Sequence, residues 1–339
     1  MRARFLWRRT VAALLAVAVI AMGVWLVQVA TSSPPSHQTT PTFQDGHHTA
    51  KATDPIHRAT SSTAASTTTS APTEQAVVRN LAVAMTEVPL VDTSRKLVNN
   101  GVVLAQDRSL PTYLWTPVAA GNYPLVVFVH GYNIGPLQYQ RFCSTLASSG
   151  YVVAAPSFPL EDPSRGNGLN RADLPNEATD VSFVITSLEN DASLYKLERS
   201  KIAVVGHSDG ADVALEIGYE QGLADHRVLA VVSDAPDPIT SPTVPSTAPL
   251  LLMQGTADSI VPYSSSQSVF AQLAGPTYYV SLLGADHLPP IAGGTQWTPV
   301  LDESVAEFLD ATVADRGPGL SALVAQLASS PLVHLETKG

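Results

Sequence analysis

The chain has 339 residues, of which 45% are hydrophobic and only 14% charged, and it contains a single cysteine. This composition excludes a fully disordered protein, a collagen and a disulfide-stabilised scaffold. The formal net charge of −10 disfavours a nucleic-acid partner, because no large basic surface is available to neutralise phosphates. After position 75 there are 13 basic and 26 acidic residues, so this part of the chain is acidic on its own account.

The N-terminal segment, residues 1–30, has the pattern of an export signal. Four arginines among the first nine residues precede an uncharged stretch that includes the 17-residue apolar run 11–27. The length of the run, and Gln28 at the −3 position of the obvious cleavage site at Ala30, favour a signal anchor. A signal peptide cleaved near 19–21 is the alternative. Both interpretations place everything downstream outside the cytoplasm, either anchored to the membrane by this helix or secreted.

Residues 31–75 have the composition of a linker. Ser, Thr and Pro make up 24 of these 45 residues, so the segment cannot bury enough apolar surface to offset the entropy of ordering, and we expect a disordered stalk. Its histidines have no fixed geometry and are expected to be solvated. The remaining residues, 76–339, are expected to form one domain with one core.

Within residues 76–339, short apolar runs alternate with helical patterns, which predicts a mainly parallel sheet with helices on both faces. Continuous runs of Val, Leu and Ile indicate strands that are buried on both faces. The expected strands are 98–104 and 112–117, both antiparallel, followed by 124–130, 151–155, 201–205, 227–232, 249–253 and 278–283. The expected helices are 137–149, 175–189, 209–219, 264–273 and 299–313.

The motif that indicates a catalytic site is Gly206-His207-Ser208-Asp209-Gly210, a G-x-S-x-G between a buried strand and a helix. A sharp turn there holds Ser208 in a strained conformation, and the flanking glycines allow the strand and the helix to approach closely. We therefore predict that Ser208 is a nucleophile.

A serine nucleophile needs a general base, and the base needs an acid to orient it. His287 follows the last expected strand and is the predicted base. Asp258 follows the preceding strand and is the predicted acid, with Asp234 as the main alternative and Asp286 as a weak one. Ligands of open α/β sheets bind outside the carboxyl ends of the strands, so these side chains should converge at one edge.

With these motifs, residues 123–309 resemble the α/β-hydrolase fold, most closely its compact dienelactone-hydrolase, cutinase-type polyesterase and acetylhydrolase branches. The resemblance implies an oxyanion hole made of two backbone N–H groups. One belongs to Asp209, and the other to Tyr132 in the His130-Gly131-Tyr132-Asn133 loop, with Asn133 as an alternative. Ser208 departs from the cysteine nucleophile of dienelactone hydrolases. Asp209 departs from the bulky apolar residue that is often found at this position in lipases.

Several other residues have structural interpretations. Cys143 is expected to be a buried helix residue, and His130 and His207 are expected to be structural hydrogen-bonding groups. The polar loop 160–174 and Trp297 are candidates for the rim of the pocket. No metal-binding spacing and no phosphate-binding loop occurs, so neither a metal nor a cofactor is expected. Residues 233–249 include five prolines and cannot form an amphipathic lid helix, so the site should open to solvent.

These observations predict an exported serine carboxylic-ester hydrolase that acts through an acyl-enzyme on a small-molecule or polymeric ester. The alternatives are another acyl-transfer enzyme (an amidase, thioesterase or acyltransferase), because these share the tetrahedral intermediate, and a catalytically silent surface binding module. The sequence does not indicate an oligomeric state.

Overall fold

The computed structural model describes residues 80–339 with the exception of Tyr195, and all of these belong to one compact unit. The predicted N-terminal helix, 1–30, and the predicted linker, 31–75, lie outside the described residues. Within residues 80–194 and 196–339, no helix combines the length and apolar character needed to cross a membrane.

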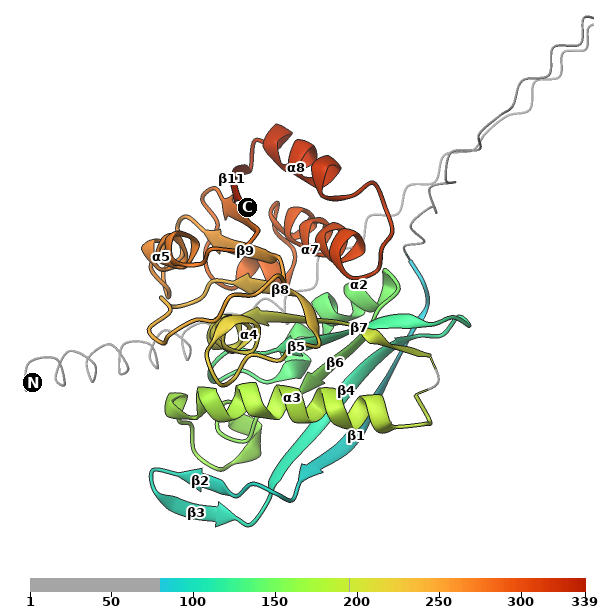
Figure 1. Ribbon diagram of the computed structural model, residues 1–339, viewed down its shortest axis with the longest axis vertical. Coiled ribbons are helices and arrows are strands. Elements are labelled where there is room, and N and C mark those ends of the chain that lie inside the picture. Colours follow the sequence, from blue (N-terminus) through green and yellow to red (C-terminus); the bar gives the residue numbers. More distant parts are fainter. Residues whose placement is uncertain (1–79, 195) are drawn as a thin grey trace, which may run out of the picture. The chain divides into compact units, whose positions relative to one another are not determined.

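The unit is built on a nine-stranded sheet with the order β1-β4-β6-β5-β7-β8-β9-β10-β11 (Figure 1). The six strands from β6 to β10 in this order are parallel, whereas β1, β4 and β11 are antiparallel to their neighbours. The strands are β1 Val83–Asp92, β4 Arg108–Pro117, β5 Tyr123–Val129, β6 Val152–Pro156, β7 Leu197–His207, β8 Val228–Asp234, β9 Leu250–Gly255, β10 Thr277–Leu282 and β11 Val333–Lys338.

Helices cover both faces of the sheet. Successive side chains of a buried strand point to opposite faces, so both faces are apolar and each needs a helical layer. The helices are α2 Gln140–Ser148, α3 Leu174–Asn190, α4 Asp209–Tyr219, α5 Ser264–Gln272, α6 Pro289–Ala292, α7 Thr298–Thr312 and α8 Leu320–Ser329, with short 3-10 turns η1 Pro136–Tyr139, η2 Pro163–Arg165 and η3 Arg171–Asp173. Along β5, for example, Val127 and Val129 belong to the core that α3, α4 and α5 complete, whereas Val126 and Phe128 belong to the core that α2, α6, α7 and α8 complete. The mainly parallel sheet with two helical layers is therefore confirmed.

The prediction of one strand at 98–104 is wrong, since this segment forms a hairpin of β2 Leu97–Asn99 and β3 Val102–Ala105. Asn100 and Gly101 have φ angles of 50° and 80° and form its turn, as expected for an Asn-Gly pair between two strands. The hairpin is a separate two-stranded sheet that extends past the ends of β1 and β4 (Figure 1). Strands β1 and β11 and helices α6 and α8 were not predicted, whereas residues 235–249 contain no helix, as the five prolines indicate.

Candidate active site

Ser208 occupies the sharp turn between β7 and α4. Its φ of 58° and ψ of −127° are strained for a residue with a side chain. The two flanking glycines are required by sterics: a Cβ at Gly206 would lie 1.8 Å from the carbonyl oxygen of Gly210, and a Cβ at Gly210 would lie 2.2 Å from that of Val129. The turn can therefore form only where both positions lack a side chain, and it presents Ser208 at the carboxyl edge of the sheet.

Asp258 and His287 are hydrogen-bonded to each other, with 2.8 Å between Asp258 Oδ2 and His287 Nδ1. The other carboxylate oxygen, Oδ1, accepts the backbone N–H groups of Ile260 and Val261, and the Gln254 amide donates to Oδ2. Burial alone would raise the pKa of Asp258, but the hydrogen bonds from His287 and from the backbone hold this pKa below its ordinary value. The carboxylate therefore stays ionised and fixes the orientation of the imidazole ring.

The loops that carry these three residues meet at the carboxyl edge of the sheet. His207, which precedes Ser208, contacts His287: its Nε2 lies 3.1 Å from the His287 carbonyl oxygen, and the two ring centroids are 4.7 Å apart. Gly255 allows the Asp258 loop to approach the His287 loop, because a Cβ there would lie 2.3 Å from the Ala285 carbonyl oxygen. The structure thus brings the predicted nucleophile, base and acid to neighbouring positions, as expected for the ends of β7, β9 and β10.

The two predicted oxyanion donors belong to segments that adjoin Ser208. Asp209 is the first residue of α4, where backbone N–H groups have no intrahelical acceptor. The loop with Tyr132 lies against Ser208, since a Cβ at Gly131 would lie 2.9 Å from Ser208 Cβ. The alternative donor, Asn133, is unsuitable because its N–H already donates to the Glu161 carbonyl oxygen at 3.0 Å.

His130 and His207 form buried structural hydrogen bonds. The Phe158 N–H donates to His130 Nε2, so the proton lies on Nδ1, which donates to the Gly131 carbonyl oxygen. Burial lowers the pKa of His207 to about 3. The neutral ring donates from Nε2 to the His287 carbonyl and interacts through Nδ1 with the Tyr139 hydroxyl at 3.0 Å. Both histidines thus fix the loops around Ser208, and Tyr139, which the sequence did not single out, belongs to the same network.

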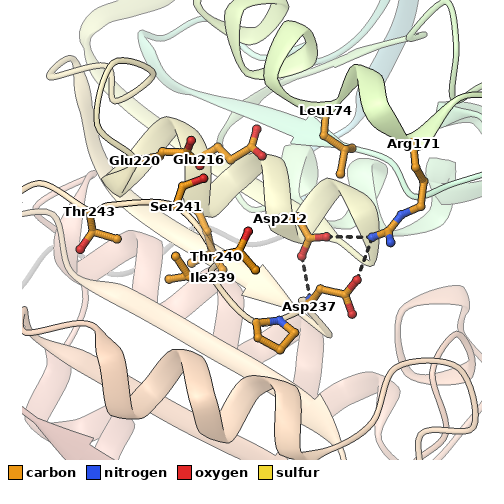
Figure 2. Close-up of a pocket in the computed structure, with 12 residues that line it drawn as sticks. Arg171, Leu174, Asp212, Glu216, Glu220, Asp237, Ile239, Thr240, Ser241 and Thr243 are labelled. Carbon is orange, nitrogen blue, oxygen red and sulfur yellow. Dashed lines mark hydrogen bonds and ion pairs between the residues drawn. The ribbon is translucent and has the colours of Figure 1, made fainter. Parts of the chain in front are cut away.

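Arg171 links helix α4 to the loop that follows β8, and Figure 2 shows its bonds to Asp212 and Asp237. Its guanidinium donates to the carboxylate of Asp209, to Asp212 at 3.1 Å and to Asp237 at 3.0 Å, and the Asp237 N–H donates to Asp212. Burial raises the pKa of Asp209 above its ordinary value, although Arg171 opposes this shift. Burial raises the pKa of Asp212 well above its ordinary value. Arg171 is therefore shared by three acidic side chains, and it lines a cavity of about 240 Å³ next to α4.

Two fully buried carboxyl groups lie behind this network. Neither Glu161 nor Glu177 has a hydrogen-bond partner for its side chain among the described residues. Burial, with a further contribution from the negative charge of Asp209, raises the pKa of Glu161 to about 9. Burial and the proximity of Glu161 also raise the pKa of Glu177 well above its ordinary value. Glu161 is therefore protonated at neutral pH, and the pKa of Glu177 is shifted in the same direction.

The two alternative acids have other surroundings. Burial raises the pKa of Asp234 to about 7. The Asp286 carboxylate accepts the N–H groups of Ser259 and His287 and so shapes the base loop. In the part of the chain that the structure describes, no group of three or more His, Cys, Asp or Glu could hold a metal ion.

The candidate rim residues have mainly structural contacts. Trp297 donates its indole N–H to the Leu283 carbonyl, and Arg165 donates to the Ser109 carbonyl. Asn167 and Asn170 contact the β2–β3 hairpin through Asn99. Cys143 is fully buried in α2, as expected. Arg171 lies in the predicted rim loop but was not singled out, because its partners are 38 to 66 positions away in the sequence.

Comparison with known sequences identifies partial relatives. The family model described as Chlorophyllase matches residues 91–257. Chlorophyllase-1, chloroplastic, from Citrus sinensis is 28% identical over 114 residues, which make up 33% of this chain and 33% of the relative. Chlorophyllase type 0 from Chenopodium album is 26% identical over 132 residues, 37% of this chain and 38% of the relative. The chain thus spans only about a third of the length of these curated relatives.

Among solved structures, a ferulic acid esterase from Streptomyces cinnamoneus matches with a TM-score of 0.60 at 19% sequence identity. The match covers 77% of this chain and 98% of that one. At this level of identity the likeness concerns the fold, and it agrees with the fold that the sequence predicts.

Proposed function

We propose that this chain, which has the α/β-hydrolase fold, is an exported serine carboxylic-ester hydrolase that acts through an acyl-enzyme. The observation that carries this proposal is the hydrogen-bonded pair of Asp258 and His287, together with the contact between His287 and His207, the residue before Ser208 in a strained strand–turn–helix elbow. An ionised carboxylate, an oriented imidazole and an adjacent hydroxyl are the groups needed to activate a serine nucleophile.

In the proposed reaction, Ser208 Oγ attacks the ester carbonyl carbon while His287 Nε2 takes the hydroxyl proton. The N–H groups of Tyr132 and Asp209 stabilise the negative charge that develops on the carbonyl oxygen, and each is worth roughly 3 kcal/mol in such sites. The tetrahedral intermediate collapses with cleavage of the C–O bond, and His287 returns the proton to the leaving alcohol. Water then attacks the acyl-enzyme by the same route and releases the acid and free Ser208. No cofactor is required.

The relatives support an ester as the substrate. The solved structure with a similar fold is a ferulic acid esterase, and the matched sequences are chlorophyllases. Amidase, thioesterase and acyltransferase activities would use the same groups, as would any acyl transfer through a tetrahedral intermediate. Export is proposed from the Arg-rich, apolar N-terminal segment and the Ser/Thr/Pro-rich stalk that follows it.

The nucleophile is tested with a fluorophosphonate probe and a soluble p-nitrophenyl ester. We expect the parent protein to be labelled and to hydrolyse the ester, and Ser208→Ala to lose labelling and at least about a thousandfold in turnover. Ser264→Ala, an exposed serine at the start of α5, is the matched control and should behave like the parent. Labelling that persists in Ser208→Ala would show that another residue is the nucleophile. A labelled parent with no ester turnover would favour another acyl-transfer activity, and an unlabelled, inactive parent would favour a binding module.

A further inference from the structure

The exposed apolar side chains of this molecule are gathered at one edge. Among the described residues, eleven large hydrophobic side chains are exposed, and eight of them lie at the carboxyl edge of the parallel strands, where Ser208 also lies. These eight are Val91, Val98, Val102, Val103, Leu104, Tyr132, Leu137 and Leu283. The other three, Met85, Val118 and Leu229, lie toward the opposite edge. Single exposed hydrophobic residues are ordinary, but such a one-sided distribution marks an interaction surface.

The β2–β3 hairpin provides half of these side chains. Val98, Val102, Val103 and Leu104 are between 39% and 60% exposed, whereas Leu97 is buried at the base of the hairpin. A two-stranded hairpin is marginally stable alone, and exposed apolar residues on its two strands contribute no hydrophobic stabilisation. We use the term apolar rim for these four hairpin residues together with Tyr132 and Leu137, which follow β5 at the same edge.

The hairpin is held in place relative to the candidate active site. The Asn99 side chain donates to the Asn167 carbonyl at 3.0 Å and accepts from the Asn170 side chain at 3.1 Å. Both partners belong to the loop that carries Arg171, which in turn is bonded to Asp209 next to Ser208. A surface that contacts the hairpin is therefore held in a defined position relative to the elbow.

Charge indicates which kind of surface the apolar rim fits. The ten residues 97–106 include no charged side chain, and the two residues that flank them, Lys96 and Asp107, carry opposite charges, although the protein as a whole has a net charge of −10. Binding to an anionic membrane relies on Lys and Arg beside the apolar residues, and an acidic protein is repelled by such a membrane. An uncharged apolar phase carries neither penalty, and it gains from burial of the exposed Val and Leu side chains.

We propose that the apolar rim docks the protein on the surface of a water-insoluble, uncharged aliphatic ester and so presents the candidate active site to that phase. This inference rests on the proposed function in one respect only, namely that the docked phase is also the substrate. Docking itself requires no catalysis. It should change the fraction of enzyme bound to the ester phase, and it should leave the turnover of a dissolved ester unchanged.

The test measures adsorption of the full chain to a trioctanoin emulsion. All variants also carry Ser208→Ala, so that the trioctanoin is not hydrolysed during the measurement. The hairpin variant combines Val102→Ser, Val103→Ser and Leu104→Ser. The matched control combines Met85→Ser, Val118→Ser and Leu229→Ser, which removes equally exposed apolar residues from the other edge. All three proteins have the same N-terminus, so its contribution to adsorption cancels. We expect the partition coefficient to fall about tenfold or more for the hairpin variant and to stay within about twofold for the control.

Equal adsorption of the hairpin variant and its parent, or an equal loss in the control, would overturn the proposal. Stronger binding to anionic phospholipid vesicles than to trioctanoin would also overturn it. So would a dimeric parent protein whose hairpin variant is monomeric but adsorbs equally well, because the apolar rim would then be a dimer interface. The single substitution Val102→Asn, at the most exposed of these residues, keeps the test valid if the triple variant is unstable. With Ser208 restored, hydrolysis of p-nitrophenyl acetate by the hairpin variant should equal that of the parent. Absence of turnover in both proteins would count against the proposed function and leave the adsorption result standing.

Discussion

At the scale of single residues, the charge of Arg171 compensates the charge of Asp209 near the proposed oxyanion. The Asp209 N–H is proposed to stabilise an oxyanion, yet its buried carboxylate would place a second negative charge close to that oxyanion. Two charges a few ångströms apart in such surroundings interact by roughly 3 kcal/mol. The guanidinium of Arg171, bonded to the Asp209 carboxylate, offsets this charge. We therefore assign Arg171 as a positioning residue that acts on the site through Asp209.

This assignment predicts a specific rescue. Arg171→Met should lower kcat for a soluble ester by about ten- to a hundredfold at pH 8. The loss should be smaller at lower pH, since the uncompensated Asp209 carboxyl then becomes protonated. In the double variant Arg171→Met/Asp209→Asn, kcat should return to within about threefold of the parent. The measurement is a pH profile of kcat for the single and double variants.

Arg165→Met is the matched control for this cycle, because Arg165 lies in the same loop but bonds the Ser109 carbonyl instead of an acid. It should leave kcat unchanged. If the double variant remains as slow as Arg171→Met, Arg171 acts by holding the loops together and charge compensation is not its role.

At the scale of elements, the loop 160–174 buries Glu161 as a protonated acid, and helix α3 buries Glu177 near it. The pKa of Glu161 is about 9 in the folded protein, against an ordinary value of 4.5. A carboxyl group whose pKa is raised by folding contributes its full stabilisation below its unfolded pKa, and this is lost as the pH rises through the folded pKa. Stability should therefore fall between about pH 4.5 and about pH 9.

Glu161→Gln removes this titration and keeps the side-chain volume. We expect its Tm relative to the parent to rise by about 3 °C or more between pH 5 and pH 8.5. Differential scanning calorimetry at several pH values measures the effect. Glu303→Gln, an exposed glutamate on α7, is the control and should give a difference in Tm that does not depend on pH. A pH-independent difference for Glu161→Gln would contradict a protonated Glu161.

Local patterns predicted the elements that position Ser208, Asp258 and His287, because each follows a continuous apolar run that only a buried strand explains. The bounds of α4, 209–219, agree with the structure for the same reason. The apolar character of 98–104 predicts one strand and hides the hairpin, although the Asn100-Gly101 pair marks a turn. Strand β1 is largely exposed and β11 lies at the edge of the sheet, so neither has the apolar pattern of a buried strand.

The side-chain network of Arg171 could not be predicted from local patterns. Its three carboxylates come from α4 and from the loop after β8, and only the folded sheet brings these segments to the loop 160–174. The same holds for Gln254 and Tyr139, which support the acid and a structural histidine through contacts that the sequence does not mark.

At the scale of the whole chain, export would place the esterase domain outside the cytoplasm, where added protease can reach the segment that precedes it. If residues 1–30 anchor the protein and 31–75 form a stalk, protease added to intact cells should release a soluble fragment that retains esterase activity. N-terminal sequencing of any soluble form distinguishes a retained anchor from a cleaved signal. An esterase that resists protease in intact cells and is digested only after lysis would contradict the proposed topology.

The catalytic edge as a whole should be open to dissolved substrates. Residues 235–249 contain no helix that could act as a lid, and Ser208 is partly exposed at the end of β7. In a lidded lipase, the site stays covered until an interface displaces the lid, so a monomeric ester is hydrolysed slowly. Here we expect the initial rate on monomeric tributyrin to rise hyperbolically from the lowest concentrations up to its solubility limit, with no lag phase. Docking through the apolar rim then changes only the bound fraction on an emulsion, so turnover per bound enzyme should match the turnover measured in solution. A negligible rate on the monomer, followed by a sharp rise at the solubility limit, would show that the edge is closed in water.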